Sequence, residues 1–195
     1  FFSNPESLIE EMENKSILLT EHRYTPEYDQ TNTCGRFCVQ FLTFKNDQHG
    51  MLALNWWRDS CNEWCFSRFE DGKFGDQKYL DDWPSRFQGV HVLQNLGGGV
   101  APWYVQKFDL VSNQTGPLIF YHFHGYNELE NDKIDLGSYR LGTDDIRIVY
   151  APYVKKLEKI TRELRKIDPY SDYNGVAKYK GLNWKNILIS ILRRI

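Results

Sequence analysis

Two short stretches of the chain carry side chains that could do chemistry, and the first is Phe120–Gly125, which reads FYHFHG. A strand that ends in a histidine places an imidazole at the rim of a sheet, where a bound ion or phosphate lies. Gly125 then lets the backbone approach a ligand closely. The alternative for this histidine is a hydrogen bond to a neighbouring loop, without any role in binding.

The second stretch reads FGDQKYLDDWP and ends at Pro84. Gly75 frees the backbone just before Asp76, so we expect Asp76 and Gln77 to begin a short helix, as N-cap and first-turn residues that face a cleft. The alternative is that Asp76 is only a cap. The nearby acids are expected to be solvent-facing or structural: Glu70, Asp71, Asp81 and Asp82.

Four cysteines form two pairs of equal spacing, Cys34 with Cys38 and Cys61 with Cys65. Such pairs resemble the ligand pattern of a zinc site. Structural zinc sites normally use two intervening residues on a tight turn, whereas three intervening residues place the partners one helical turn apart. The spacing therefore favours reduced, buried thiols over a zinc site.

Composition sets the broad class of the protein. The chain has 195 residues, 41% of them hydrophobic, which is enough for the core of one domain. The formal net charge is −2, and lysines and arginines are spread through the chain except in the basic tail 155–195, which argues against a nucleic-acid partner. The sequence shows no run of about eighteen apolar residues and no signal peptide, so we expect a cytoplasmic protein.

Periodicity and capping predict the elements that must position these residues. Strands that alternate with helices indicate an α/β sandwich with a mixed, mainly parallel sheet, and such sheets bind ligands at the carboxyl ends of their strands. We expect a polar loop over 21–33 and a central strand over 35–44. The predicted helices are 5–13, 48–66 (capped by Asp47), 153–167 and 184–195, and the other predicted strands are 16–20, 90–94, 117–121 and 146–150.

The order of these segments resembles the bacterial nucleotide-sugar glycosyltransferases of polysaccharide and lipopolysaccharide gene clusters. Those enzymes are similar to the retaining galactosyl- and glucosyltransferases with a Rossmann-like, GT-A domain. The resemblance covers residues 1–153, and its sharpest parts are FGDQKYLDDWP, VHVLQ-x-x-G-x-G-x-APW and FYHFHG. Residues 154–195 are then a helical tail.

The resemblance implies roles for particular residues. In that family an Asp-x-Asp motif, which would lie upstream of Phe1, holds Mn²⁺ or Mg²⁺ on the nucleotide diphosphate, and a histidine of an H-[FY]-x-G motif adds a ligand. His122 fits that position, with His124 as the alternate and Gly125 as the glycine of the motif. Asp76 would bind hydroxyls of the donor sugar, and Gln77 would lie near the reacting carbon.

This sequence departs from the family pattern in two places. The family phrase F-N-A-G is here Phe37-Cys38-Val39-Gln40, so Cys38 and Gln40 replace a sugar-binding asparagine and a glycine that admits the donor. This change puts the identity of the donor in doubt. The chain also begins with Phe1, after the Asp-x-Asp position, so we expect an N-terminally truncated domain that is inactive by itself.

Further sugar contacts are expected from the run that follows VHVLQ. Gly98 and Gly99 lie in a glycine cluster that lacks a helix N-terminus behind it, so it predicts a turn close to the nucleotide or acceptor rather than a phosphate loop. Trp103 is either an aromatic wall for a sugar or part of the buried core. Arg23 and Lys78 are considered for contact with phosphate and left outside the assignment.

The tail ends in Trp184–Ile195, in which Ile187, Ile191 and Ile195 recur every four residues beside several cations. This pattern is typical of an interfacial helix that brings an enzyme to the inner face of an anionic membrane with a lipid-linked acceptor. A helix packed on the domain shows the same pattern.

These observations predict an enzyme fragment that transfers a sugar from a nucleotide-diphosphate sugar to a glycan or lipid-linked acceptor. An alternative of a different class is a non-catalytic carbohydrate-binding or scaffold module whose aromatic residues line a sugar groove. A third is a zinc-binding interaction domain built on the four cysteines.

Overall fold

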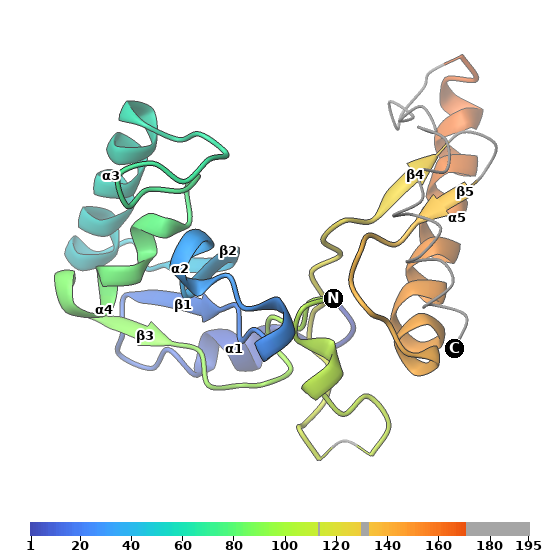
Figure 1. The fold of residues 1–195 in the computed structure, drawn as a ribbon, viewed down its shortest axis with the longest axis horizontal. Coiled ribbons are helices and arrows are strands. Elements are labelled where there is room, and N and C mark those ends of the chain that lie inside the picture. Colours follow the sequence, from blue (N-terminus) through green and yellow to red (C-terminus); the bar gives the residue numbers. More distant parts are fainter. Residues whose placement is uncertain (113, 130–132, 171–195) are drawn as a thin grey trace. The chain divides into compact units, whose positions relative to one another are not determined.

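The computed structural model describes residues 1–112, 114–129 and 133–170 (Figure 1). The chain separates into two compact units, Phe1–His122 and Phe123–Ile195. The boundary predicted after residue 153 instead falls within helix α5 (Ala151–Ile167).

The first unit contains a mixed sheet with the strand order β2-β1-β3. Strand β1 (Ile17–Glu21) lies antiparallel to β2 (Phe37–Phe44) and parallel to β3 (Val90–Val92). The structure is therefore α/β, but the sheet as described has one antiparallel and one parallel pair and is not mainly parallel.

Strand β2 was predicted to be central, and this prediction is wrong: among the described strands β1 is central, because it lies between β2 and β3. The first four residues of β1 are all buried, whereas only the first two residues of β2 are. A continuous buried run marks a strand that is covered on both faces. The run Ile17-Leu18-Leu19 thus identifies the central strand better than the aromatic content of β2.

One face of the sheet is covered by helix α3 (Gln48–Glu63), by the 3-10 helix η2 (Lys78–Asp82) and by α4 (Trp83–Arg86). Asp47 caps α3 as predicted, since its carboxylate accepts a hydrogen bond from the Gly50 N–H. The core on this face consists of Ile17, Leu19, Phe37, Ala53, Leu80 and Trp83.

The other face carries helix α1 (Glu6–Glu10). Leu18 points to this face, as expected from the alternation of side chains along β1. Leu8 on this helix and Met12 just after it are buried, whereas Ile9 is exposed. The core here consists of Leu8, Met12, Leu18, Leu93, Ile119 and Phe120.

The segment predicted as a strand at 117–121 is not one. It forms a single parallel bridge between Tyr121 and Val100. The N–H groups of Ile119 and Phe120 both donate to the Gly97 carbonyl, so no regular ladder forms. The remaining short elements of this unit are η1 (Pro26–Tyr28), α2 (Thr31–Cys34) and η3 (Val105–Lys107).

The second unit has a hairpin of β4 (Asn127–Leu129) and β5 (Lys133–Asp135), followed by the π-helical turn η4 (Asp145–Tyr150) and helix α5. The strand predicted at 146–150 is therefore wrong. A short β-branched run is ambiguous by periodicity, and here it continues directly into a helix. Helix α5 confirms the predicted helix at 153–167.

Within the described ranges, no helix is both long and apolar enough to cross a bilayer. The helix predicted at Trp184–Ile195 lies outside the described residues.

Candidate functional site

A pocket of about 460 Å³ opens at the carboxyl ends of the parallel strands β1 and β3. Its walls include residues that directly follow both strands, Arg23 and Tyr24 after β1 and Leu93 and Gln94 after β3. Parallel strands present their carboxyl ends at one edge of a sheet, and α/β sheets bind ligands there. The pocket therefore lies where the fold class predicts a ligand.

Arg23 is the most constrained residue of this pocket. Its Nη1 atom donates to the carbonyl oxygens of Asn95 and Gly98, both at 3.0 Å, and its Nη2 atom donates to the carbonyl of Leu93. Burial lowers the pKa of the guanidinium, although the nearby Tyr104 and acidic groups oppose this effect. The arginine has a φ of 54°, and such a left-handed conformation costs about 1–2 kcal/mol in a residue other than glycine.

The other charged side chains of the pocket form ion pairs or hydrogen bonds with neighbouring residues. Arg36 forms an ion pair with Glu21, the last residue of β1. Asp29 accepts hydrogen bonds from the N–H and hydroxyl groups of Thr31. Lys107 is exposed on η3, and its Nζ atom lies 3.4 Å from the carbonyl oxygen of Tyr24.

A cluster of aromatic rings lies beside the pocket. His22 stacks on Tyr24, with 4.5 Å between ring centroids, and the Trp103 indole donates a 2.8 Å hydrogen bond to the His22 carbonyl. The rings of Trp103 and His122 are 5.5 Å apart. Trp103 is only 4% exposed, so this residue packs in the core as one of the two sequence interpretations expected.

Burial lowers the pKa of His22 to about 4, and the nearby His122 adds to this effect. Backbone hydrogen bonds to Arg36 and Gly35 and the charge of Asp81 oppose it. A buried imidazole of this kind is neutral at physiological pH.

Asp76 and Gln77 lie just before η2. Gln77 is the N-cap position of that helix, and its side chain makes no capping hydrogen bond, so the predicted helix start at Asp76 is one residue too early. The Asp76 carbonyl accepts a 2.8 Å hydrogen bond from the indole of Trp57 on α3. Among the residues that the structure describes, the half-buried Asp76 carboxylate has no hydrogen bond or ion pair.

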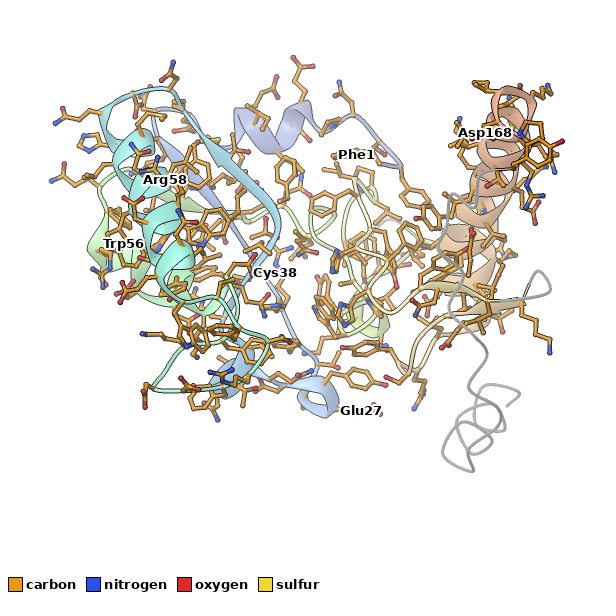
Figure 2. The ribbon with its side chains drawn as sticks, turned by 90° about the horizontal axis from the view of Figure 1, so that it is seen from above. Phe1, Glu27, Cys38, Trp56, Arg58 and Asp168 are labelled. Atoms are coloured by element: carbon orange, nitrogen blue, oxygen red, sulfur yellow. The ribbon has the colours of Figure 1, made fainter. Side chains whose placement is uncertain are left out.

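The Asp76 carboxylate lies close enough to Cys38 and Cys61 to act on both thiols. Burial raises the pKa of Cys38 to about 11, and the negative charge of Asp76 raises it further. Cys38 is on β2 (Figure 2) and is paired with Thr20 near the carboxyl end of β1. Asp76 thus acts on a thiol that pairs with the end of β1, and His122 acts on His22, which follows β1. That Asp76 and His122 share one site stays a prediction.

The remaining predicted substrate contacts of the first unit are buried against protein atoms. Gln40 donates through Nε2 to the Gly99 carbonyl at 3.4 Å. A Cβ added to Gly99 would lie 2.6 Å from Thr20 Cγ2, and one added to Gly98 would lie 2.7 Å from a methyl group of Leu93. The close backbone approach predicted for these glycines is thus made to the protein itself, and their contact with a ligand stays a prediction.

His124 and Gly125 belong to the second unit. His124 is exposed, and its ring lies 6.0 Å from that of Tyr139. Gly125 has a φ of 78° and is tightly packed, because an added Cβ would lie 3.2 Å from Gly137 Cα. The positive φ and the close packing explain why a glycine is required at this position. The predicted role of Gly125 in substrate binding stays a prediction.

The described residues do not complete a metal site. No group of three or more histidine, cysteine, aspartate and glutamate side chains in this part of the chain could hold a metal ion. The four cysteines are free thiols, with Cys38 buried and Cys65 exposed, and do not form the zinc site of the third interpretation. His122 could supply one ligand to Mn²⁺ or Mg²⁺.

Sequence reasoning missed His22 and undervalued Arg23. Both follow directly after the buried strand Ile17–Glu21, and the rule that ligands bind at the carboxyl ends of strands points to this position. By residue type alone, an isolated arginine is indistinguishable from a solvated surface charge. The three long-range carbonyl partners of Arg23 are not visible in the sequence.

Comparisons with known proteins give two relatives in Bacillus subtilis (strain 168). The uncharacterized protein YfnD is 32% identical over 184 residues, which cover 87% of this chain and 58% of that protein. The uncharacterized protein YfnF is 28% identical over 191 residues, which cover 91% of this chain and 62% of that protein. The chain thus spans about three fifths of the length of these relatives. No family model and no solved structure matches the chain.

Proposed function

We propose that the chain is part of a nucleotide-sugar glycosyltransferase that builds a bacterial surface polysaccharide. The enzyme would transfer a sugar from a nucleotide-diphosphate sugar to a glycan or lipid-linked acceptor, on a Rossmann-like GT-A domain of which this chain is the C-terminal part. The proposal draws on the motif resemblance of FGDQKYLDDWP and FYHFHG.

The observation that carries the proposal is the placement of Asp76 and His122. These residues come from segments that are far apart in the sequence. Asp76 acts on Cys38, which is on β2 and pairs with Thr20 near the carboxyl end of β1, and His122 acts on His22, which follows β1. A pocket between the ends of β1 and β3 lies at the same edge of the sheet.

The chemistry of sugar transfer explains why these residue types would be needed. Cleavage of the bond between sugar and phosphate builds positive charge on the anomeric carbon and negative charge on the leaving diphosphate. The Asp76 carboxylate, which has no hydrogen-bond or ion-pair partner in the described part of the chain, could hold hydroxyl groups of the donor sugar and stabilise the oxocarbenium-like centre. The Gln77 amide would lie near the reacting carbon.

Transfer assays on the full-length gene product with Mn²⁺ and a panel of nucleotide sugars test this proposal. We expect Asp76→Ala and His122→Ala each to lower turnover at least about a hundredfold, which equals roughly 2.7 kcal/mol of barrier stabilisation. Asp71→Ala, which removes an exposed acid shortly before this segment, is the matched control and should keep wild-type turnover. Full activity in both site variants would refute the assignment.

The 195-residue chain alone is expected to be inactive, so transfer by this chain would contradict the truncated-domain interpretation. Binding of a glycan without any turnover of nucleotide sugars would instead favour the carbohydrate-binding module. The tyrosines of the pocket, Tyr24 and Tyr104, are the observation that favours this second candidate, because tyrosine combines an apolar ring with a polar tip.

A further inference from the structure

We propose that the pocket at the carboxyl ends of β1 and β3 binds a phosphoryl group, and that Arg23 is its central cation. The inference names a phosphate site in the proposed glycosyltransferase, and it rests on that proposed function for the identity of the natural ligand. The capacity to bind phosphate follows from the pocket itself.

The hydrogen bonds of Arg23 leave part of its guanidinium available. An arginine carries five N–H donors. Three hydrogen bonds to the carbonyls of Leu93, Asn95 and Gly98 fix the position of the group, and two N–H donors remain. Among the described residues no carboxylate forms an ion pair with Arg23. The described hydrogen bonds of this half-buried positive charge go to neutral carbonyls, and Glu21 and Glu11 act on it only electrostatically. Such a charge is suited to an anion, because an anion would offset the cost of its burial.

The backbone around Arg23 holds the side chain in this orientation. Arg23 has a left-handed φ of 54°, which a non-glycine residue adopts only when its surroundings impose it. The preceding residue is fixed by a hydrogen bond from His22 N to Arg36 O, and Thr25 is fixed by one from its N to Trp103 O. Strained residues of this kind are typical of ligand sites.

The charges of the other pocket residues also favour an anion. The pocket is lined by three cations, Arg23, Arg36 and Lys107, against two carboxylates, Glu21 and Asp29, which leaves one net positive charge. Glu21 is paired with Arg36, and Asp29 is hydrogen-bonded to Thr31. The remaining positive charge therefore resides on Arg23 and Lys107.

The size of the pocket limits the ligand to a small molecule or to the head of a larger one. A volume of about 460 Å³ lies within the range of small-molecule sites. Within the proposed function, the phosphoryl group could belong to the nucleoside diphosphate or to a phosphate-bearing acceptor. Both ligands present the same chemistry to Arg23.

Calorimetric titration of the chain with inorganic pyrophosphate tests the inference directly. We expect Lys107→Glu to weaken binding of pyrophosphate at least tenfold, because this exposed residue lines the pocket. Arg23→Lys, which keeps the charge but loses the planar fork, should also weaken binding. Arg58→Glu is the matched control, since it makes the same change of charge on the exposed side of α3 (Figure 2) and should bind as the wild type does.

Two outcomes would overturn the inference: no binding by the wild type, or equal weakening by Lys107→Glu and Arg58→Glu, which would indicate a general effect of charge. Arg23→Lys could disturb folding, so circular dichroism of each variant accompanies the titration, and the exposed Lys107 alone suffices for the decision. Titrations with a nucleoside diphosphate and with a short prenyl phosphate then distinguish the two sources, because the natural source should bind more tightly than pyrophosphate.

The experiment also separates this inference from the proposed function. Pyrophosphate binding that depends on Lys107, in a full-length protein that transfers no sugar, would support the phosphate pocket and refute the transferase. Sugar transfer without pyrophosphate binding, and without any effect of Lys107→Glu, would support the transferase and refute the pocket.

Discussion

The indole N–H of Trp57 donates a 2.8 Å hydrogen bond to the main-chain carbonyl of Asp76. Trp57 lies on α3 and packs against the core of that face of the sheet, whereas Asp76 lies in a turn before η2. The bond thus ties the turn of the candidate catalytic acid to a rigid helix. Its role is to position Asp76, because it leaves the carboxylate itself untouched.

Replacement of Trp57 with phenylalanine should therefore affect both stability and the candidate site. The variant leaves the Asp76 carbonyl without its donor. This loss should lower the free energy of unfolding by about 1 kcal/mol, in addition to the loss caused by the smaller buried area of the phenylalanine ring. Trp56→Phe removes the same atoms from the neighbouring position on α3. Urea denaturation of both variants measures the difference, and equal losses would show that the bond to Asp76 contributes nothing.

The buried imidazole of His22 should make the protein sensitive to mild acid. Burial lowers the folded-state pKa of His22 to about 4, whereas the value in the unfolded chain is about 6.5. Below pH 6.5 only the unfolded chain takes up this proton, so stability that is present above pH 6.5 is lost as the pH falls towards 4. Between pH 6.5 and 5 this loss should reach about 2 kcal/mol.

Urea denaturation at a series of pH values checks this expectation. The wild type should lose stability over that window, and His22→Gln should lose correspondingly less, even if the variant is less stable at neutral pH. His124→Gln removes an exposed imidazole and should keep the wild-type profile. A His22→Gln profile parallel to that of the wild type would show that His22 takes up its proton equally in both states.

The sequence was sufficient for the elements with strong local signals. The buried run of β1, the Asp47 cap of α3 and the apolar periodicity of α5 each encode their element locally, and all three elements are present. The segments 117–121, apolar and aromatic, and 146–150, rich in β-branched residues, have the composition of strands but do not form them. The conformation of 117–121 depends on hydrogen bonds to a distant group, the Gly97 carbonyl. The conformation of 146–150 depends on its continuity with the following helix.

The residues of the candidate site also differ in how far local sequence signals could predict them. Gly75 is a local signal for the short helix expected next to Asp76, and η2 begins close by, with Gln77 as its N-cap. The strand expected to end at His122 is not formed by residues 117–121, so the position of this imidazole was not encoded locally. The importance of Arg23 depends on carbonyls about seventy residues further along the chain, Leu93 and Gly98 among them. No local pattern encodes such long-range contacts.

A glycine-to-alanine substitution separates packing from ligand binding in the glycine cluster. A Cβ at Gly97 would lie 1.9 Å from the Pro117 carbonyl oxygen, so the segment that carries Ile119 would have to move. We expect Gly97→Ala to lower the free energy of unfolding by about 3 kcal/mol. At Gly142 the nearest atom lies 3.4 Å from an added Cβ, so Gly142→Ala should change stability by less than about 1 kcal/mol. A stable Gly97→Ala protein would refute the packing role.

The four thiols should react with iodoacetamide in an order set by burial. Cys65 is exposed and should react first. Burial raises the pKa of Cys38 to about 11 and that of Cys61 to about 12, so few of these thiols are thiolates at pH 8. We expect both to react at least about a hundredfold more slowly than Cys65 in the native protein, and all four thiols to react readily in urea. Peptide mass spectrometry after timed quenching measures the order.

Bound zinc would instead protect Cys65 until a chelator is added, because a metal-bound thiolate is not free to react. That result would restore the zinc-binding interpretation.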